Sequence, residues 1–145
     1  MHSVYTMGYT GLSMEAIQKK VQELDAYLVD IRYMAGSRAP MWRQASFKSA
    51  LKERYIHLQA LGNKNYRGGP IEIADLSKGI AFVEKILPHN NVLLMCACED
   101  VNVCHRKWVS RKLFEAGADI IHLRKTDFAE KPKKKKESVQ PLKLL

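Results

Sequence analysis

The sequence predicts an α/β fold, a three-layer sandwich around a mainly parallel five-stranded sheet. Five short apolar runs alternate along the chain with four segments of helical periodicity. This alternation favours crossover connections, which make the strands parallel and place helices on both faces of the sheet. The length of 145 residues fits one such domain, and 46% hydrophobic residues suffice for its core.

A helix separates the first two predicted strands. Residues 4–7 form a short apolar run that stops at a glycine-containing turn. Ser13 then stands where an N-cap is needed. Apolar residues recur on one face of the helix that follows: Ile17, Val21 and Leu24. Residues 27–31 are nearly continuous in apolar character, as in a strand that is covered on both faces.

An irregular loop of about a dozen residues follows Arg32, and its length indicates a functional lid. Ser46 is predicted to cap the next helix. That helix is expected to carry Phe47, Ala50, Leu51 and Arg54. Residues 55–58 are the predicted third strand. The composition of the glycine-rich loop over residues 61–70 favours mobility over packing.

The second half of the chain repeats the pattern. Apolar residues step by three or four positions up to a proline: Leu76, Ile80, Val83 and Leu87. Residues 92–96 are the most apolar run and predict a central strand. A helix is expected to resume near Asn102 or Cys104 and to end at Gly117, where a left-handed conformation costs glycine little. Residues 119–123 form the last predicted strand.

The net charge of +9 is unevenly distributed. Residues 131–145 hold six lysines against one glutamate. We therefore expect a basic, disordered tail over residues 129–145, behind a single domain over residues 1–128. Such a tail would attract nucleic acid through counterion release, or it would serve only as a solubilising extension.

The composition argues against a membrane protein and against a secreted disulfide scaffold. No apolar run approaches the roughly 20 residues of a membrane span, and the N-terminus lacks the pattern of a signal peptide. The three cysteines are odd in number and lack the spacing of a disulfide framework. We expect reduced thiols, a cytoplasmic location and no membrane partner.

The C-terminal ends of the predicted strands locate a candidate site. In a parallel sheet these ends share one edge, and ligands bind in the crevice beyond it. Polar groups gathered there would be costly in a core, which favours a position facing a cleft. The residues that leave the first, second and fourth strands are Gly8, Tyr9, Thr10, Asp30, Arg32 and Cys96 to Asp100.

The segment between the central strand and the next helix is the sharpest local signal. Backbone N–H groups at the helix start, with His105 and Arg106 in its first turn, predict a pocket for a phosphate, sulfate or carboxylate. The positive electrostatic field of this helix start would also favour the thiolate form of Cys104. The alternative is that Cys96 and Cys98 are core residues and that Arg106 pairs with an acid.

A metal site is a further alternative, since Cys96, Cys98, Cys104 and His105 are soft or borderline ligands. Their spacing differs from that of familiar zinc modules. On a helix the adjacent side chains of Cys104 and His105 would point about 100° apart, which opposes convergence. We therefore predict no metal ligand and no cofactor.

Asp30 and Arg32 are two positions apart on a strand, so both side chains are expected to point to the same side. In a functional role the carboxylate orients His105 or acts as a general base, and the guanidinium holds an anion. The alternative is a weak surface ion pair. Aromatic residues of the loops would either stack on a base or pack beneath their own loop: Tyr9, Tyr33, Trp42 and Tyr66.

Four motifs in this order resemble the domain of unknown function family DUF488. They are Tyr5 to Gly11, Leu28 to Arg32 with Ser37, Arg38 and Pro40, Tyr55 to Leu58 with Leu61 and Gly62, and Cys96 to Arg106. The resemblance spans residues 4–124 and implies an α/β fold, but the family has no settled activity. It points to Gly8, Asp30, Arg32, Ser37, Cys96, Cys104, His105 and Arg106. The chain departs from the family at Cys98, where an acidic residue is usual, and at residues 34–36, where a proline is common.

A looser similarity is to rhodanese-like domains, in the strand that ends at Arg32 and the later strand that ends at Cys96. The fold class is accordingly Rossmann-like or rhodanese-like. A persulfide cradle needs converging N–H donors around one cysteine. Here Glu99 and Asp100 follow Cys96 closely and would repel an anion, so sulfur transfer is not our leading interpretation.

Three functional hypotheses follow, all of which expect Asp30, Arg32, His105 and Arg106 at one edge of the sheet. The first is an enzyme acting on a phosphate-bearing or nucleic-acid-related substrate. Its catalytic residues would be Asp30, Cys96, Cys104 and His105, and its anion-binding residues Gly8, Tyr9, Thr10, Arg32, Ser37, Arg38 and Arg106. The second is a non-catalytic nucleic-acid-binding module with a footprint of Arg38, Arg43, Lys64 and Arg67. The third is a structural zinc protein.

Overall fold

The computed structural model describes residues 2–128, so the predicted basic tail over residues 129–145 lies outside the described residues. The described chain has the predicted α/β architecture. Its sheet is parallel throughout, with the strand order β3-β2-β4-β1-β5. The strands are β1 (Val4–Gly8), β2 (Ala26–Asp30), β3 (Tyr55–His57), β4 (Asn91–Cys96) and β5 (Ile120–His122).

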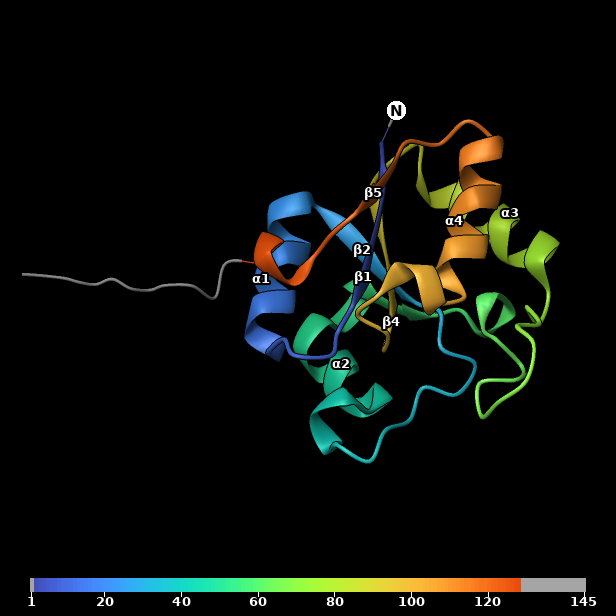
Figure 1. The fold of residues 1–145 in the computed structure, drawn as a ribbon. Helices are drawn as coiled ribbons and strands as arrows, with labels where there is room; N and C mark the ends of the chain where they lie inside the picture. Colours follow the sequence, from blue (N-terminus) through green and yellow to red (C-terminus); the bar gives the residue numbers. More distant parts are fainter. Residues whose placement is uncertain (1, 129–145) are drawn as a thin grey trace, which may run out of the picture.

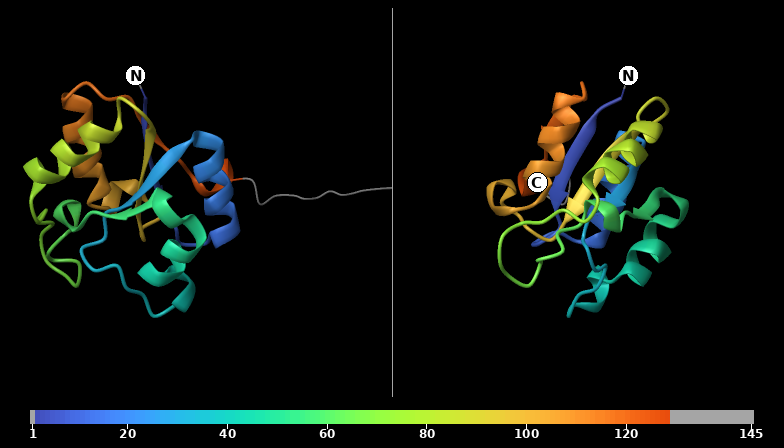
Figure 2. Two further views of the ribbon diagram at one scale, coloured as in Figure 1. Left: turned by 180° about the vertical axis from the view of Figure 1, so that it is seen from behind. Right: turned by 90° about the vertical axis from the view of Figure 1, so that its right-hand side faces the viewer.

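Helices cover both faces of this sheet, as a three-layer sandwich requires (Figure 1). They are α1 (Met14–Leu24), α2 (Gln44–Leu51), α3 (Leu76–Ile86) and α4 (Arg106–Glu115). The pair α1 and α2 packs on one face, and the pair α3 and α4 packs on the other (Figure 2). None of the helices in residues 2–128 has the length and apolar character needed to cross a bilayer.

The central strand β4 supplies side chains to two separate hydrophobic clusters. Leu93 and Met95 pack in the cluster beneath α1 and α2, whereas Val92 and Leu94 pack in the cluster beneath α3 and α4. All four side chains are fully buried. Because neighbouring residues of a strand point to opposite faces, a strand covered on both sides must be apolar at every position. The predicted central strand is thereby confirmed.

The start of α1 follows from local sequence. The Ser13 hydroxyl oxygen accepts a hydrogen bond from the Ala16 amide at 3.1 Å, as an N-cap does. Ile17 and Val21 are buried on the sheet side of the helix. The predicted cap and apolar face of this helix are therefore both confirmed.

The predicted cap of α2 is wrong. The helix begins at Gln44, and Ser46 lies inside it and donates its hydroxyl to the Pro40 carbonyl at 2.8 Å. A short 3-10 turn over Pro40–Trp42 buries Trp42, and the helix begins three residues earlier than predicted. At its other end the helix stops at Leu51, so that Arg54 lies in a separate turn.

The start of α4 lies later than predicted. Residues Val101–Val103 form their own 3-10 turn, and Cys104 follows in an extended conformation with φ −111° and ψ 146°. The helix proper begins at Arg106. Gly117 has φ 103°, the left-handed conformation expected beyond a helix C-terminus. Cys104 therefore stands outside the helix, which changes the direction of its side chain.

Candidate functional site

A cleft of about 920 Å³ opens beyond the C-terminal ends of the strands. The loop after β2 contributes Tyr33, Ser37 and Arg38, and the loop after β3 contributes Tyr66 and Arg67. The segment between β4 and α4 contributes the remaining chemistry: Cys96, Cys98, Cys104 and His105. The cleft therefore lies at the edge of the sheet where the sequence places it.

Parallel register brings these segments together. Gly8 is paired with Cys96, and Asp30 is paired with Met95 on one side and with His57 on the other. The ends of β1, β2, β3 and β4 are thus level at this edge. Residues more than sixty positions apart in the sequence become neighbours.

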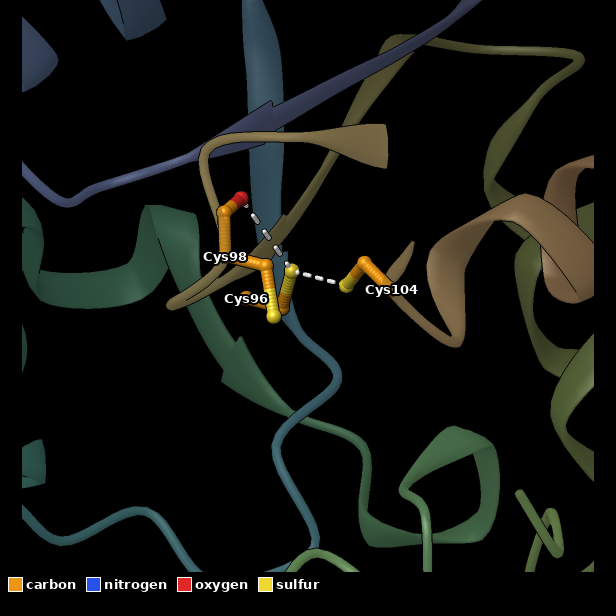
Figure 3. A group of neighbouring side chains, drawn as sticks. All are labelled: Cys96, Cys98 and Cys104. Atoms are coloured by element: carbon orange, nitrogen blue, oxygen red, sulfur yellow. Dashed lines mark hydrogen bonds between the residues drawn. The ribbon is translucent and has the colours of Figure 1, made fainter. Parts of the chain in front are cut away.

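Three cysteine sulfurs lie together under the cleft (Figure 3). The Sγ atoms of Cys96, Cys98 and Cys104 all lie within 4.8 Å of one another. The Sγ atoms of Cys96 and Cys104 are 2.6 Å apart. Cys96 is 1% and Cys104 2% exposed, whereas Cys98 is only partly buried. All three are free thiols in this structure.

The hydrogen bonds among these sulfurs separate their pKa values. Those from Cys104 and Cys96 hold the pKa of Cys98 far below its ordinary value. Hydrogen bonds to its neighbours and burial raise the pKa of Cys96. For Cys104 the hydrogen bond with Cys96 lowers the pKa, but Cys98 and burial outweigh it, and the pKa rises to about 11. Cys98, the most exposed of the three, is therefore the thiol with the lowered pKa, and the two buried thiols have raised pKa values.

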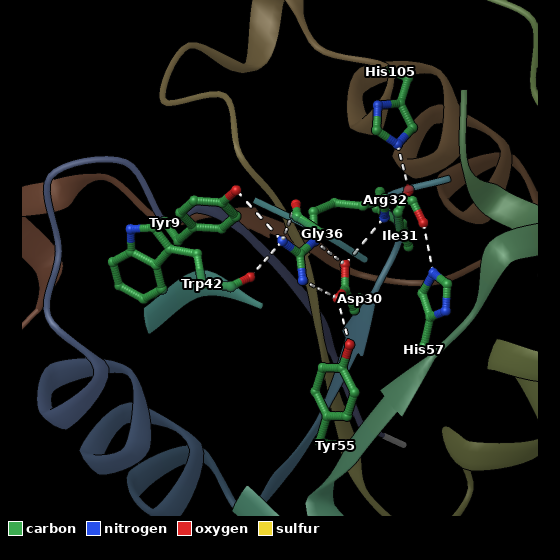
Figure 4. Close-up of polar contacts among 9 residues, drawn as sticks. All are labelled: Tyr9, Asp30, Ile31, Arg32, Gly36, Trp42, Tyr55, His57 and His105. Carbon is green, nitrogen blue, oxygen red and sulfur yellow. Dashed lines mark hydrogen bonds and ion pairs between the residues drawn. The ribbon is translucent and has the colours of Figure 1, made fainter. Parts of the chain in front are cut away.

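His105 is oriented by a backbone carbonyl. Its Nε2 lies 2.7 Å from the Ile31 oxygen, to which it donates, and its Nδ1 lies 3.8 Å from the Cys104 sulfur. Burial lowers the pKa of this histidine, so the neutral ring is favoured. The expectation that the Asp30 carboxylate orients His105 is corrected, because Ile31, the residue after β2, presents its carbonyl to the ring instead (Figure 4).

Arg106 is 1% exposed, and its guanidinium donates to acceptors within the fold. Its Nη1 donates to the Thr6 hydroxyl at 2.8 Å, and its Nη2 donates to the carbonyls of Cys98 and Glu99, both at 3.0 Å. Its Nε donates to the Cys96 sulfur at 3.3 Å. The guanidinium thus fixes the turn after β4 and lies behind the cleft.

Asp30 and Arg32 form a buried, bidentate ion pair (Figure 4). Arg32 Nε lies 2.9 Å from Oδ1 of Asp30, and Nη2 lies 2.6 Å from Oδ2. The Tyr55 hydroxyl donates to Oδ2 at 2.5 Å. Arg32 Nη1 donates to the Trp42 carbonyl at 2.7 Å and to the Gly36 carbonyl at 3.3 Å. The alternative of a weak surface pair is therefore corrected, since this pair is internal and fastens the loop after β2.

The four residues that were expected at one edge of the sheet lie at two different depths. Arg32 and His105 line the cleft, while Asp30 and Arg106 lie beneath its surface. The side chains of Asp30 and Arg32 are committed to each other and to neighbouring groups. Among the residues described here, the cleft arginines without an ion-pair partner are Arg38 and Arg67.

The remaining predicted residues hold the backbone of the site. A Cβ at Gly8 would overlap the carbonyl oxygen of Cys98, so the close approach of these two segments needs glycine. The Thr10 hydroxyl donates to the Ala97 carbonyl at 2.6 Å. The Ser37 hydroxyl accepts from the Ala39 amide at 3.1 Å. These contacts shape the loops around the cleft.

The aromatic residues fall into two groups. Tyr9 and Trp42 are buried and pack on each other, with ring centroids 4.7 Å apart. Tyr33 and Tyr66 line the cleft, and Tyr66 is 48% exposed. The guanidinium of Arg67 lies 5.5 Å from the Tyr66 ring centroid. An exposed ring beside a free cation suits a planar, negatively charged ligand.

The geometric argument against a metal site is also corrected. It assumed that Cys104 and His105 both occupy a helix, whereas Cys104 is extended and precedes α4. The two side chains approach each other, and Cys104 joins the two cysteines that leave β4. Cys98, which is not among the predicted catalytic and anion-binding residues, belongs to this cluster. Its alternation with Cys96 along the chain is the signal that identifies it.

No protein-family model, curated protein or solved structure matches this chain. The resemblances to the DUF488 family and to rhodanese-like domains stay predictions from the residues. The interpretation of the site depends on its geometry.

Proposed function

We propose that the chain binds a phosphate-bearing ligand of the nucleotide type in the cleft at the C-terminal edge of the sheet. The observation that carries this proposal is the pairing of two free cations, Arg38 and Arg67, with the exposed ring of Tyr66 in one cleft. Guanidinium groups bind phosphate through charge-assisted hydrogen bonds. An exposed aromatic ring gives a base a surface on which to stack.

The different depths of the charged groups in the cleft indicate where the phosphate of such a ligand would lie. Arg38 and Arg67 are exposed at the rim, whereas the sulfurs lie on the floor. The phosphate therefore belongs at the rim, where the two guanidinium groups are, and the lowered pKa of Cys98 agrees with this because a thiolate on the floor would oppose an anion there. A reducing compartment such as the cytoplasm would keep the three thiols free.

Calorimetric titration of the full chain with adenosine monophosphate, adenosine and inorganic phosphate tests this proposal. The monophosphate should bind more tightly than adenosine. The double substitution Arg38→Ala and Arg67→Ala should weaken its binding by about 10–100-fold, the loss expected for charged hydrogen bonds. Tyr66→Ala should weaken binding of the monophosphate and leave that of inorganic phosphate unchanged.

The matched control removes two positive charges elsewhere, by Lys85→Ala and Lys112→Ala on α3 and α4. Equal loss of affinity in both double variants would show a general charge effect and reject a phosphate site in the cleft. Absence of binding by the unaltered chain would reject the proposal directly.

A nucleic-acid strand is the second candidate ligand, favoured by the same ring and cations. Within the predicted footprint, Arg43 donates to the Ser37 carbonyl, and Lys64 is paired with Glu72 at 3.6 Å. Arg38 and Arg67 are therefore the members free to contact phosphates. Binding of a single-stranded oligonucleotide without binding of the mononucleotide would favour this candidate, and its affinity should fall steeply with salt.

A further inference from the structure

The three sulfurs beneath the cleft have the spacing of a metal-binding set (Figure 3). Sulfur ligands of a tetrahedral zinc ion, each at about 2.3 Å, lie roughly 3.7 Å from one another. All three Sγ atoms here lie within 4.8 Å of one another. The Cys96–Cys104 pair, at 2.6 Å, would need to open by roughly 1 Å.

His105 offers a fourth donor beside the three sulfurs, next to Cys104. Its Nδ1 lies 3.8 Å from the Cys104 sulfur, and its Nε2 donates to the Ile31 carbonyl. With the proton on Nε2, the neutral ring offers the lone pair of Nδ1 as a ligand. Donation of the other ring N–H to a backbone carbonyl is the usual support of a metal-ligating histidine.

The charge of Arg106 gives an independent indication. The guanidinium is 1% exposed, and among residues 2–128 no carboxylate lies within ion-pair distance of it. Its acceptors are a hydroxyl, two carbonyls and the Cys96 sulfur. A buried cation requires a nearby negative charge. A zinc ion with three thiolates and one neutral imidazole carries one net negative charge, which balances this guanidinium.

We propose that Cys96, Cys98, Cys104 and His105 bind one Zn²⁺ ion through three Sγ atoms and Nδ1. Thiolate and imidazole ligands together select zinc among the common divalent cations. Four protein ligands make a closed, structural site, and binding releases the remaining thiol protons to solvent. The ion would join the end of β4 to the start of α4 and so form the floor of the cleft.

This inference is independent of the ligand proposed for the rim, because Arg38, Arg67 and Tyr66 are not among the metal ligands. Its test uses the full chain, reduced with a phosphine and freed of metal under anaerobic conditions. Titration with Co²⁺ should give one equivalent of a complex with thiolate-to-cobalt charge transfer and the intense visible bands of tetrahedral coordination. Zn²⁺ should displace the Co²⁺ and protect all three thiols from alkylation, as counted by mass spectrometry.

Two variants test the ligands individually. Cys98→Ser, at the most exposed of the three positions, should lower charge-transfer intensity and reduce zinc affinity by at least about 100-fold, beyond the loss typical of an outer partner. His105→Gln should keep the charge-transfer band and shift the visible bands. His89→Gln is the matched control, because His89 is exposed and precedes the start of β4, whereas the site lies at its end. Its visible bands should match those of the unaltered chain.

Three results would overturn the assignment. They are no stoichiometric metal binding by the reduced chain, unchanged zinc affinity in Cys98→Ser, and alkylation of the thiols at the same rate with and without zinc. Visible bands of His105→Gln identical to those of the unaltered chain would overturn the four-ligand set. The thiol-protection measurement needs no variant, so misfolding of a variant does not decide the outcome.

Discussion

The ion pair between Asp30 and Arg32 is a buried polar contact at the edge of the sheet. Each carboxylate oxygen accepts from Arg32, and Oδ2 also accepts from Tyr55. The other end of the guanidinium holds the carbonyl of Trp42. The last residue of β2 and the arginine two positions beyond it therefore connect the sheet to the loop that follows.

Substitution Asp30→Asn leaves the buried guanidinium without its counter-charge. We expect the free energy of unfolding to fall by about 3–5 kcal/mol, as when one partner of a buried pair is removed. Glu23→Gln is the control, because Glu23 pairs with Lys20 on the surface and such pairs contribute about 0–1 kcal/mol. Urea denaturation followed by circular dichroism measures both. Equal losses in the two variants would contradict the account of Asp30 as a buried anchor.

The Tyr55 hydroxyl should make stability depend on alkaline pH. Burial and the Asp30 carboxylate raise the pKa of Tyr55 above its ordinary value of 10.0. The folded chain therefore keeps a proton above pH 10 that the unfolded chain releases. The stability contributed by this hydroxyl is fully present below pH 10 and is lost as the pH rises further.

We accordingly expect Tyr55→Phe to lower the free energy of unfolding by about 1–3 kcal/mol at pH 8, the cost of losing a hydrogen bond to a charged group. At pH 11 the free energies of unfolding of Tyr55→Phe and the unaltered chain should differ by less than they do at pH 8. Urea denaturation at both pH values measures it, and comparing the two proteins at each pH cancels the titration of the lysines. A difference that stays constant would refute the role assigned to the raised pKa.

The helices differ in how far local sequence decides where they begin. Ser13 caps α1 with its own side chain. By contrast, His105 precedes α4 without a side-chain cap, because its ring is engaged with Ile31 and Cys104. The start of α4 therefore lacks a side-chain cap, and the residue at that position makes contacts with other parts of the fold instead.

Removal of the α1 cap by Ser13→Ala should cost about 0.5–2 kcal/mol of stability. The expected loss arises because the Ala16 amide no longer has its side-chain acceptor. Ser49→Ala, at an exposed position within α2, should change stability by less than about 0.5 kcal/mol. Thermal or urea unfolding of both variants provides the comparison, and equal effects would show that the cap contributes nothing specific.

At the scale of the molecule, the sheet is stabilised by two hydrophobic clusters rather than one. Leu93 and Leu94 are adjacent, fully buried, and members of different clusters. Their positions follow from the period of two along a strand. The edge beyond β4 is where the apolar layers end and the cleft begins.

Truncation on either face should therefore be costly. We expect Leu93→Ala and Leu94→Ala each to lower the free energy of unfolding by about 2–5 kcal/mol, through lost burial and the cavity left behind. Val103→Ala is the control, because this side chain is 71% exposed and its loss should cost less than about 0.5 kcal/mol. A low cost at one leucine in urea denaturation would mean that its face is not tightly covered.

The sequence by itself determined the fold class, the five strands and the edge where the cleft lies. These features follow from hydrophobic periodicity, which local composition encodes directly. The apolar run of β4 and the cap at Ser13 are examples in which neighbours along the chain settle the outcome.

Only the tertiary structure decided the order of the strands and the roles of the ionisable residues. In the sequence, Arg32 and Arg106 stand where arginines that bind an anion would stand. In the folded chain, however, their guanidinium groups donate to Trp42 and Thr6, which come from other parts of the sequence. Cys104 lies beside the other cysteines because a 3-10 turn precedes it and α4 begins only after it. Burial and side-chain direction depend on what packs above a residue, and that information is not local to the residue.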